Sequence, residues 1–205
     1  MKLLDFLLLY ALLLVAMSAH EFSHGWVAYK LGDATAKNSG RLTLNPLKHI
    51  DPMGTLILPL LLFITTHGQF VFGAAKPVPI NYRALRNPKK DIIWIGASGP
   101  LANFAFAFTL SLFLRILPAQ TLLTHLIVNL IMINLLLAIF NLIPIPPLDG
   151  SRILIGLLPE KLSYSYASIE PYGFIILIAL IALGVINAIV IPLLNFILGL
   201  MLLPF

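Results

Sequence analysis

A long apolar run that ends in two histidines and a glutamate constrains this fold most. Residues 3–19 are apolar except for Asp5, Tyr10 and Ser18, and the sequence H-E-F-S-H follows directly at positions 20–24. Lipid-facing helices avoid charged side chains, because burial of an unpaired ion costs several kcal/mol on most scales. The run therefore predicts a membrane helix, and the polar group at its end requires a functional explanation.

The H-E-x-x-H pattern predicts half of a metal site. On a helix, positions i and i+4 share a face, so His20 and His24 can bind one ion together. Imidazole nitrogens suit zinc, which accepts tetrahedral sites. Glu21 lies one residue along, where it can act as general base on an attacking water. The alternative is a helix that leaves the membrane at His20, with both imidazoles merely hydrated.

Two histidines make an incomplete catalytic site, so a third ligand is needed. Of the eight acidic residues, only Asp149 follows a long apolar segment inside a distorted stretch, N-L-I-P-I-P-P-L-D-G at 141–150. Three prolines within four residues cannot continue a helix. The backbone groups that they free are tolerated at membrane depth only beside protein or a water-filled cavity. Asp149 is therefore the predicted third ligand, and a plain helix end with a solvated aspartate is the alternative.

Three motifs together resemble the site-2 protease family of intramembrane zinc metalloproteases. They are H-E-F-S-H at 20–24, G-P-L-A-N at 99–103 and N-L-I-P-I-P-P-L-D-G at 141–150. The resemblance covers most of the chain to about Gly150. It implies that His20, His24 and Asp149 bind one zinc ion and that Glu21 activates water. It also implies that Asn141 holds the substrate backbone or the oxyanion.

Composition places the chain among polytopic membrane proteins. It has 205 residues, of which 60% are hydrophobic and 10% charged, which is not the balance of a soluble domain. We expect one domain over 1–205, a minimal form of the family with no room for a PDZ or CBS domain. Its core, 1–150, carries both metal motifs, and 151–205 supplies a cytoplasmic connection and C-terminal membrane helices.

Charge and cysteine content exclude other classes. The chain has no cysteine, so it has no disulfide and no thiolate ligand. The formal net charge is +5, but the cations lie in loops between apolar runs and form no basic patch interleaved with aromatic residues. Nucleic acid is therefore not an expected partner.

The apolar runs predict an all-α fold with about four to six membrane segments. The first run is not a signal peptide, because the polar motif lies where a cleavage site would be. It is about 25 Å long at 1.5 Å per residue. The bilayer core is about 30 Å thick, so the metal should lie just inside the far face. Further spans are expected at 92–117 and 122–143. The run 173–204 is too long for one span, so Gly184 or Pro192 should break it.

Residues 53–72 are expected to form a re-entrant or interfacial element. The apolar part is interrupted by Pro59, and its length is below that of a membrane span. Both flanking loops are rich in lysine and arginine, as cytoplasmic loops are. The helix before Asp149 must also run parallel to the first helix for Asp149 to reach His20 and His24. A full crossing at 53–72 would place Asp149 on the wrong side.

A small membrane-associated β-sheet on the cytoplasmic side is the remaining expected element. Residues 34–46 contain the turn signal N-S-G, and 74–80 contain prolines that suit a sheet edge. The resemblance implies such a sheet, whose edge can pair with an unwound substrate strand. Ordinary loop is the alternative.

Other polar residues receive structural interpretations. Asn103 is interpreted as a residue that makes a hydrogen bond between helices. The alternative is a functional role as a polar group near the metal site. Intramembrane asparagines usually face the bundle interior. The histidines outside the motif, His49, His67 and His125, are not assigned to zinc.

The predicted function is zinc-dependent hydrolysis of peptide bonds in or near the transmembrane helix of single-span membrane proteins. Such an enzyme would serve regulated intramembrane proteolysis or the clearance of membrane remnants. We expect a multi-pass protein of a prokaryotic plasma membrane, with its active site near the cytoplasmic face. Its partners are the lipid bilayer and those substrates, and homo-oligomerisation is left open.

Two alternatives remain. A metal-binding transporter or a non-catalytic adaptor would also carry intramembrane His and Asp, but it would not need Glu21. A different class of membrane metalloprotease would use a later glutamate as third ligand. The candidates Glu160 and Glu170 both lie in a polar connection, which ranks this class low.

Overall fold

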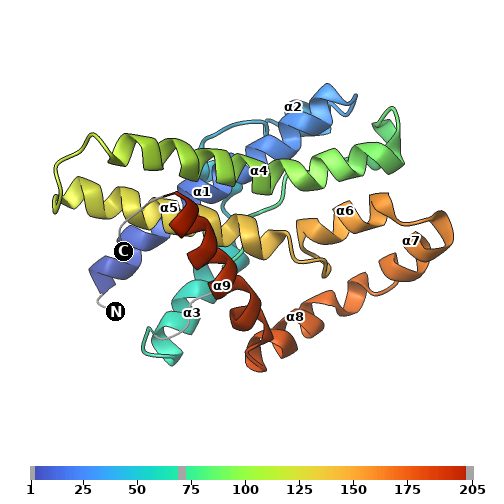
Figure 1. Cartoon of the computed structure of the whole chain (residues 1–205). Coiled ribbons are helices and arrows are strands. Elements are labelled where there is room, and N and C mark those ends of the chain that lie inside the picture. The colour runs from blue at the N-terminus through green and yellow to red at the C-terminus, as the bar shows by residue number, and fades with distance from the viewer. Residues whose placement is uncertain (1–2, 69–72, 202–205) are drawn as a thin grey trace.

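A computed structural model of the chain describes residues 3–68 and 73–201. The α-helices of this part are α1 Leu3–Lys30, α2 Thr35–Asn38, α3 Leu58–Thr65, α4 Pro88–Leu114, α5 Leu122–Asn141, α6 Asp149–Leu157, α7 Glu160–Ala167, α8 Gly173–Ala182 and α9 Val185–Leu200 (Figure 1). Short turns of 3-10 or π-helix add Pro46–His49, Pro52–Ile57, Tyr82–Ala84 and Glu170–Tyr172.

Helix α1 continues through the metal motif instead of ending before it. Its apolar run contains no proline, and the helix ends only after Lys30. Gly32, with φ of +116°, then reverses the chain in a backbone conformation that side chains disfavour. The Asp33 N–H donates to the Ala28 carbonyl at 2.9 Å, which satisfies one of the last free carbonyls of the helix. The motif therefore lies on a rigid helix.

Four helical stretches among the described residues are long and apolar enough to cross a bilayer. They are Leu3–Lys30, Pro88–Leu114, Leu122–Asn141 and Glu160–Ala182. Figure 1 shows α4 running opposite to α1 and α5, so that α1 and α5 are parallel. Proline at the first position of α4 and Thr121 as the cap of α5 define where the two inner helices begin.

The largest hydrophobic core joins α5 to α9. Each helix contributes a stripe of buried residues at a spacing of four, which lies on one helical face. The α5 stripe is Ile127, Ile131, Leu135 and Ile139, and the α9 stripe is Ile186, Val190, Leu194 and Leu198. Helix α9 can return across α5 because Gly184, with φ of +73°, separates it from α8. Gly184 is thus the predicted break, and Pro192 lies inside α9.

The segment around α3 leaves the bundle and returns to the same place. The Gly54 carbonyl accepts from the Ala74 N–H at 3.0 Å, and Thr55 Oγ1 donates to the Ala74 carbonyl at 2.7 Å. A crossing segment would have its two ends about 30 Å apart. This arrangement is the one that a re-entrant element requires, and its entry into the bilayer stays a prediction. Residues 69–72 of the expected element lie outside the described residues.

The prediction of a β-sheet was wrong: no residue of 3–68 or 73–201 is in a strand. Residues 34–46 form α2 and turns, and the Asp33 carboxylate accepts from the Thr35 N–H at 2.9 Å where α2 begins. Residues 74–80 form neither helix nor strand, and Pro77 and Pro79 have no N–H for a ladder. The N–H groups of Ala74 and Lys76 donate to single carbonyls, those of Gly54 and His49, and Arg41 donates to the Lys76 carbonyl at 2.7 Å.

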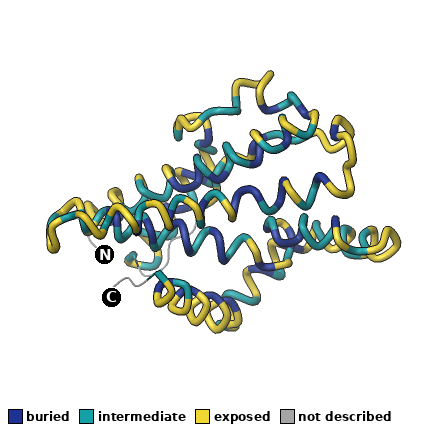
Figure 2. The backbone as a smooth tube through the Cα atoms, turned by 45° about the horizontal axis from the view of Figure 1, so that its top comes forward, coloured by how far each residue is buried: buried dark blue, intermediate teal, exposed yellow. Residues whose placement is uncertain are grey.

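Apolar side chains cover much of the outer surface, as expected of a protein surrounded by lipid. Exposed residues recur along the outermost helices in Figure 2. On α8 they include Phe174, Ile175 and Ile178. The outer face of α1 exposes Leu3, Leu4 and Leu7. Soluble monomers rarely carry apolar patches of this extent.

The hydrogen bonds between 54–55 and 74 predict that the loops on either side of α3 share one side of the membrane. The chain has no native cysteine, so single cysteines at Ser39 and Asn87, both exposed, can report their side. An impermeant thiol reagent should label neither variant in intact cells and both after lysis. Labelling of Asn87→Cys alone from outside would show that the segment crosses.

Candidate metal centre

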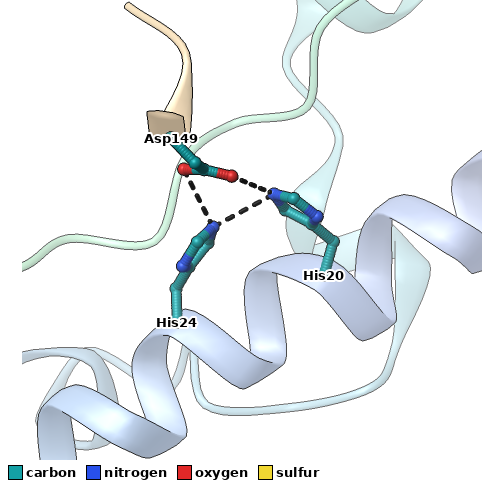
Figure 3. Close-up of side chains that lie close together, drawn as sticks. All are labelled: His20, His24 and Asp149. Atoms are coloured by element: carbon teal, nitrogen blue, oxygen red, sulfur yellow. Dashed lines mark hydrogen bonds and ion pairs between the residues drawn. The ribbon is translucent and has the colours of Figure 1, made fainter. Parts of the chain in front are cut away.

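The two motif histidines present one nitrogen each to the same point. His20 and His24 lie one turn apart on α1, each 7% exposed. Their Nε2 atoms are 3.0 Å apart. Figure 3 shows both rings directed away from α1 toward Asp149, which lies at the start of α6.

The proline-rich loop brings Asp149 to the histidines. Helix α5 ends at Asn141, and the chain turns back tightly before α6 begins. A Cβ at Gly150 would lie 2.2 Å from the Leu142 carbonyl oxygen, so only glycine fits this turn. The Asp149 carboxylate then reaches both rings, with Oδ2 at 2.9 Å from His20 Nε2 and Oδ1 at 3.3 Å from His24 Nε2.

Helix α6 is held in place on two sides. Gly96 of α4 lets it approach closely, since a Cβ there would lie 3.0 Å from the Asp149 carbonyl oxygen. On the other side, Arg152 Nη1 donates to Glu170 Oε2 at 2.9 Å, and a second bond joins the same two groups. A bidentate arginine–carboxylate pair fixes orientation as well as distance. The position of Asp149 thus follows from the packing of α6.

Each histidine has its other ring nitrogen occupied. His20 Nδ1 lies 2.6 Å from Asn103 Oδ1, and His24 Nδ1 lies 2.7 Å from the Ile95 carbonyl oxygen. Both partners are acceptors, so each Nδ1 donates a proton, and in the neutral, metal-binding form each ring presents a lone pair at Nε2. Two lone pairs and a carboxylate that face one another repel unless a cation lies between them.

The donor set fits zinc. One ligand atom from each of His20, His24 and Asp149 lies within 4.8 Å of the others, and no second group of this kind occurs among the described residues. Two imidazoles and one carboxylate, with a fourth position open, are a typical catalytic zinc set.

Gly99 leaves room for the site. A Cβ at this position would lie 2.5 Å from both His20 Nε2 and His24 Nε2, closer than real Cβ atoms approach. Gly99 begins the G-P-L-A-N motif of α4, which passes directly over the two rings. Its missing side chain is what allows α4 and the metal ligands to share this space.

Glu21 lies beside the histidine pair and is held by the extended segment 74–80. Its Oε2 accepts from the Val78 N–H at 2.7 Å. A carboxylate has a second oxygen, and this bond leaves Oε1 to another partner. The side chain is partly exposed, unlike those of the two histidines.

The structure brings together three of the five residues predicted for the site. Asn141 lies at the end of α5, where its Nδ2 donates to the Leu137 carbonyl of the same helix at 2.9 Å. His49 donates through Nε2 to the Thr43 carbonyl, away from the cluster.

Asn103 makes the interhelical hydrogen bonds that the sequence interpretation gave it, to Asn134 Oδ1 at 2.7 Å and to the Ala16 carbonyl at 3.2 Å. It also contacts His20, which the sequence interpretation kept only as the second alternative.

Two comparisons with known proteins, one with family profiles and one with curated sequences, place the chain among metalloproteases. The sequence profile of peptidase family M50 matches residues 115–184. The "Putative zinc metalloprotease YwhC" of Bacillus subtilis is 38% identical over 193 residues, which cover 89% of this chain and 84% of that protein. The "Putative zinc metalloprotease Rip2" of Mycolicibacterium smegmatis is 32% identical over 184 residues, or 89% of this chain and 69% of that protein. No solved structure matches.

Substitution of Gly99 tests the placement of the site under α4. Gly99→Ala should lose most of its bound metal, because the new Cβ would displace one or both imidazoles. Gly199→Ala is the matched control, since a Cβ there meets nothing within 4 Å. Elemental analysis of both purified variants measures the effect. Wild-type metal content in Gly99→Ala would show that the ligands do not lie where α4 passes.

Proposed function

Because the chain belongs to peptidase family M50 and is a zinc metalloprotease, we propose that it is an intramembrane endopeptidase. It cleaves peptide bonds in or near the transmembrane helix of single-span membrane proteins. The observation that carries this proposal is the position of the ligand cluster. His20 and His24 follow an apolar run of membrane length on one continuous helix, so the site lies within reach of a substrate in the bilayer.

We assign His20, His24 and Asp149 as the zinc ligands. Zinc in such a site supplies a Lewis acid and an open coordination position for water and the substrate carbonyl. The chain's own groups supply the rest. Asn103 and the Ile95 carbonyl keep the two rings in the tautomer that leaves Nε2 free.

Glu21 is the proposed general base. The Val78 N–H holds Oε2, so the carboxylate cannot rotate freely and Oε1 is available to the attacking water. The water oxygen bonds to the peptide carbon as Glu21 takes its proton. The carbon–nitrogen bond then breaks as Glu21 passes that proton to the leaving amine. Asn141 is proposed to steady the substrate backbone or the developing oxyanion.

The substrate must unwind before it can be cut. In a transmembrane helix every backbone carbonyl is hydrogen-bonded within the helix, and the side chains shield it from attack. Residues that weaken the helix in the substrate, such as glycine and proline, should therefore favour cleavage.

The site is proposed to lie near the cytoplasmic face. The hydrogen bonds of Gly54 and Thr55 to Ala74 support a location of both loops that flank α3 on the same side of the membrane. These loops carry nine basic residues, which is the bias of cytoplasmic loops. They are Lys30, Lys37, Arg41, Lys48, Lys76, Arg83, Arg86, Lys89 and Lys90.

The proposed base is tested by Glu21→Gln in a cleavage assay. The purified protein would be reconstituted in liposomes with single-span substrates, some with a glycine or proline in the span. Loss of the base should lower the rate by about 10²–10⁴-fold or more, while zinc content stays near that of the wild type. Glu160→Gln, at an exposed position on α7, is the control and should cleave normally. Undiminished cleavage by Glu21→Gln would refute the assignment, and cleavage of soluble peptides alone would refute the substrate class.

The third ligand is tested separately. Asp149→Ala should lose both zinc and activity, because two imidazoles alone leave the site incomplete. Asp149→Asn retains an oxygen donor and should keep weak zinc binding. Zinc content and cleavage are measured for both. If Asp149→Ala binds zinc as the wild type does, the third ligand lies elsewhere, and Glu160 and Glu170 return as candidates.

A further inference from the structure

A chain of buried amides connects three membrane helices behind His20. Asn103 of α4 and Asn134 of α5 are both fully buried. An amide that is buried in a bundle costs free energy unless its donors and acceptor are satisfied. Here the two side chains bond to each other, and Asn103 also bonds to α1 at two points.

Backbone carbonyls determine which atom donates and which accepts in each hydrogen bond of the two buried amides. Asn134 Nδ2 donates to the Leu130 carbonyl at 2.8 Å, so Asn134 Oδ1 is the atom that faces Asn103. Asn103 Nδ2 donates to this oxygen at 2.7 Å and to the Ala16 carbonyl at 3.2 Å. If the Asn103 amide were flipped, its Oδ1 would face the oxygens of Ala16 and Asn134, and oxygens that only accept cannot bond to each other. Its Oδ1 is therefore left for His20.

This orientation determines the state of His20. Asn103 Oδ1 accepts from His20 Nδ1 at 2.6 Å, which places the proton on Nδ1 and the lone pair on Nε2, beside Asp149. His24 obtains the same tautomer from the Ile95 backbone carbonyl. Of the two histidines, only His20 has its tautomer determined by a side chain and not by a backbone carbonyl.

We propose that Asn103 is a positioning residue of the zinc site, which sets the tautomer and ring orientation of His20. The inference rests on the proposed function, because it takes His20 as a ligand. The Ala16 carbonyl can only accept from Asn103 Nδ2, so it fixes the orientation of Asn103 even without Asn134, and the bond from Asn103 to His20 is part of the metal site and not only a link between helices. Loss of such an outer hydrogen bond lowers metal affinity by about 10–100-fold in comparable sites.

Two near-isosteric substitutions separate positioning from packing. Asn103→Leu and Asn103→Asp both lose the amide donor to Ala16 and Asn134, but only Asp keeps an oxygen that accepts from His20 Nδ1. The zinc dissociation constant of each purified full-length variant would be measured by competition with a chelator, and folding would be followed by thermal unfolding in detergent. Asn103→Leu should bind zinc about 10–100-fold more weakly, and Asn103→Asp close to the wild type.

A substitution on α5 provides a second comparison. Asn134→Leu removes the same bond between α4 and α5 but leaves Asn103 bonded to Ala16 and His20. Its zinc dissociation constant should stay close to the wild-type value. If Asn103→Leu does not fold, Asn103→Ala removes the same acceptor with a smaller side chain and takes its place in the comparison.

Equal zinc loss in Asn103→Asp and Asn103→Leu, or in Asn134→Leu, would overturn the inference, because affinity would then follow interhelical packing. His20→Ala distinguishes this failure from a failure of the proposed function. If His20→Ala loses zinc while the Asn103 variants behave alike, only the positioning role is refuted. If His20→Ala retains wild-type zinc binding, the ligand set itself is refuted.

Discussion

Mutual repulsion among two imidazole lone pairs and a carboxylate is the interaction on which the rest of this structure depends. His20, His24 and Asp149 present these groups within 4.8 Å of one another in a largely buried setting. With both rings neutral and no metal ion bound the arrangement is unfavourable, because low-dielectric surroundings strengthen repulsion. The packing of α1, α4 and α6 must therefore hold the ligands together against it, and a bound divalent ion converts the repulsion into attraction.

Close approach between helices provides that packing. Helix association in lipid depends on van der Waals contact and polar bonds, since lipid tails are as apolar as leucine. Gly96 and Gly99 let α4 lie against α6 and the histidine rings: a Cβ would be crowded at Gly96 and would collide at Gly99. The Arg152–Glu170 pair fixes α6 from the other side. The same small and polar positions thus stabilise the bundle and define the site.

Sequence periodicity predicted the elements whose signals are local. The apolar runs gave α1, α4 and α5, and Gly184 was one of two predicted breaks in the last run. The β-sheet was wrong because β-like patterns do not reveal that 74–80 bonds to the side chains of Glu21 and Arg41 and to isolated carbonyls instead of to a strand. The contact of Asn103 with His20 depends on how two helices are rotated against each other, which a single sequence does not encode in readable form.

Zinc K-edge X-ray absorption of the purified wild-type protein tests the central claim most directly. Outer-shell scattering counts imidazoles, and the first shell distinguishes nitrogen and oxygen from sulfur. The account predicts nitrogen and oxygen ligands at about 2.0–2.2 Å, two of them imidazoles, and no sulfur. A third imidazole would bring in His49, His67 or His125, and a single imidazole would remove His20 or His24. Either result would contradict a site built from His20, His24 and Asp149.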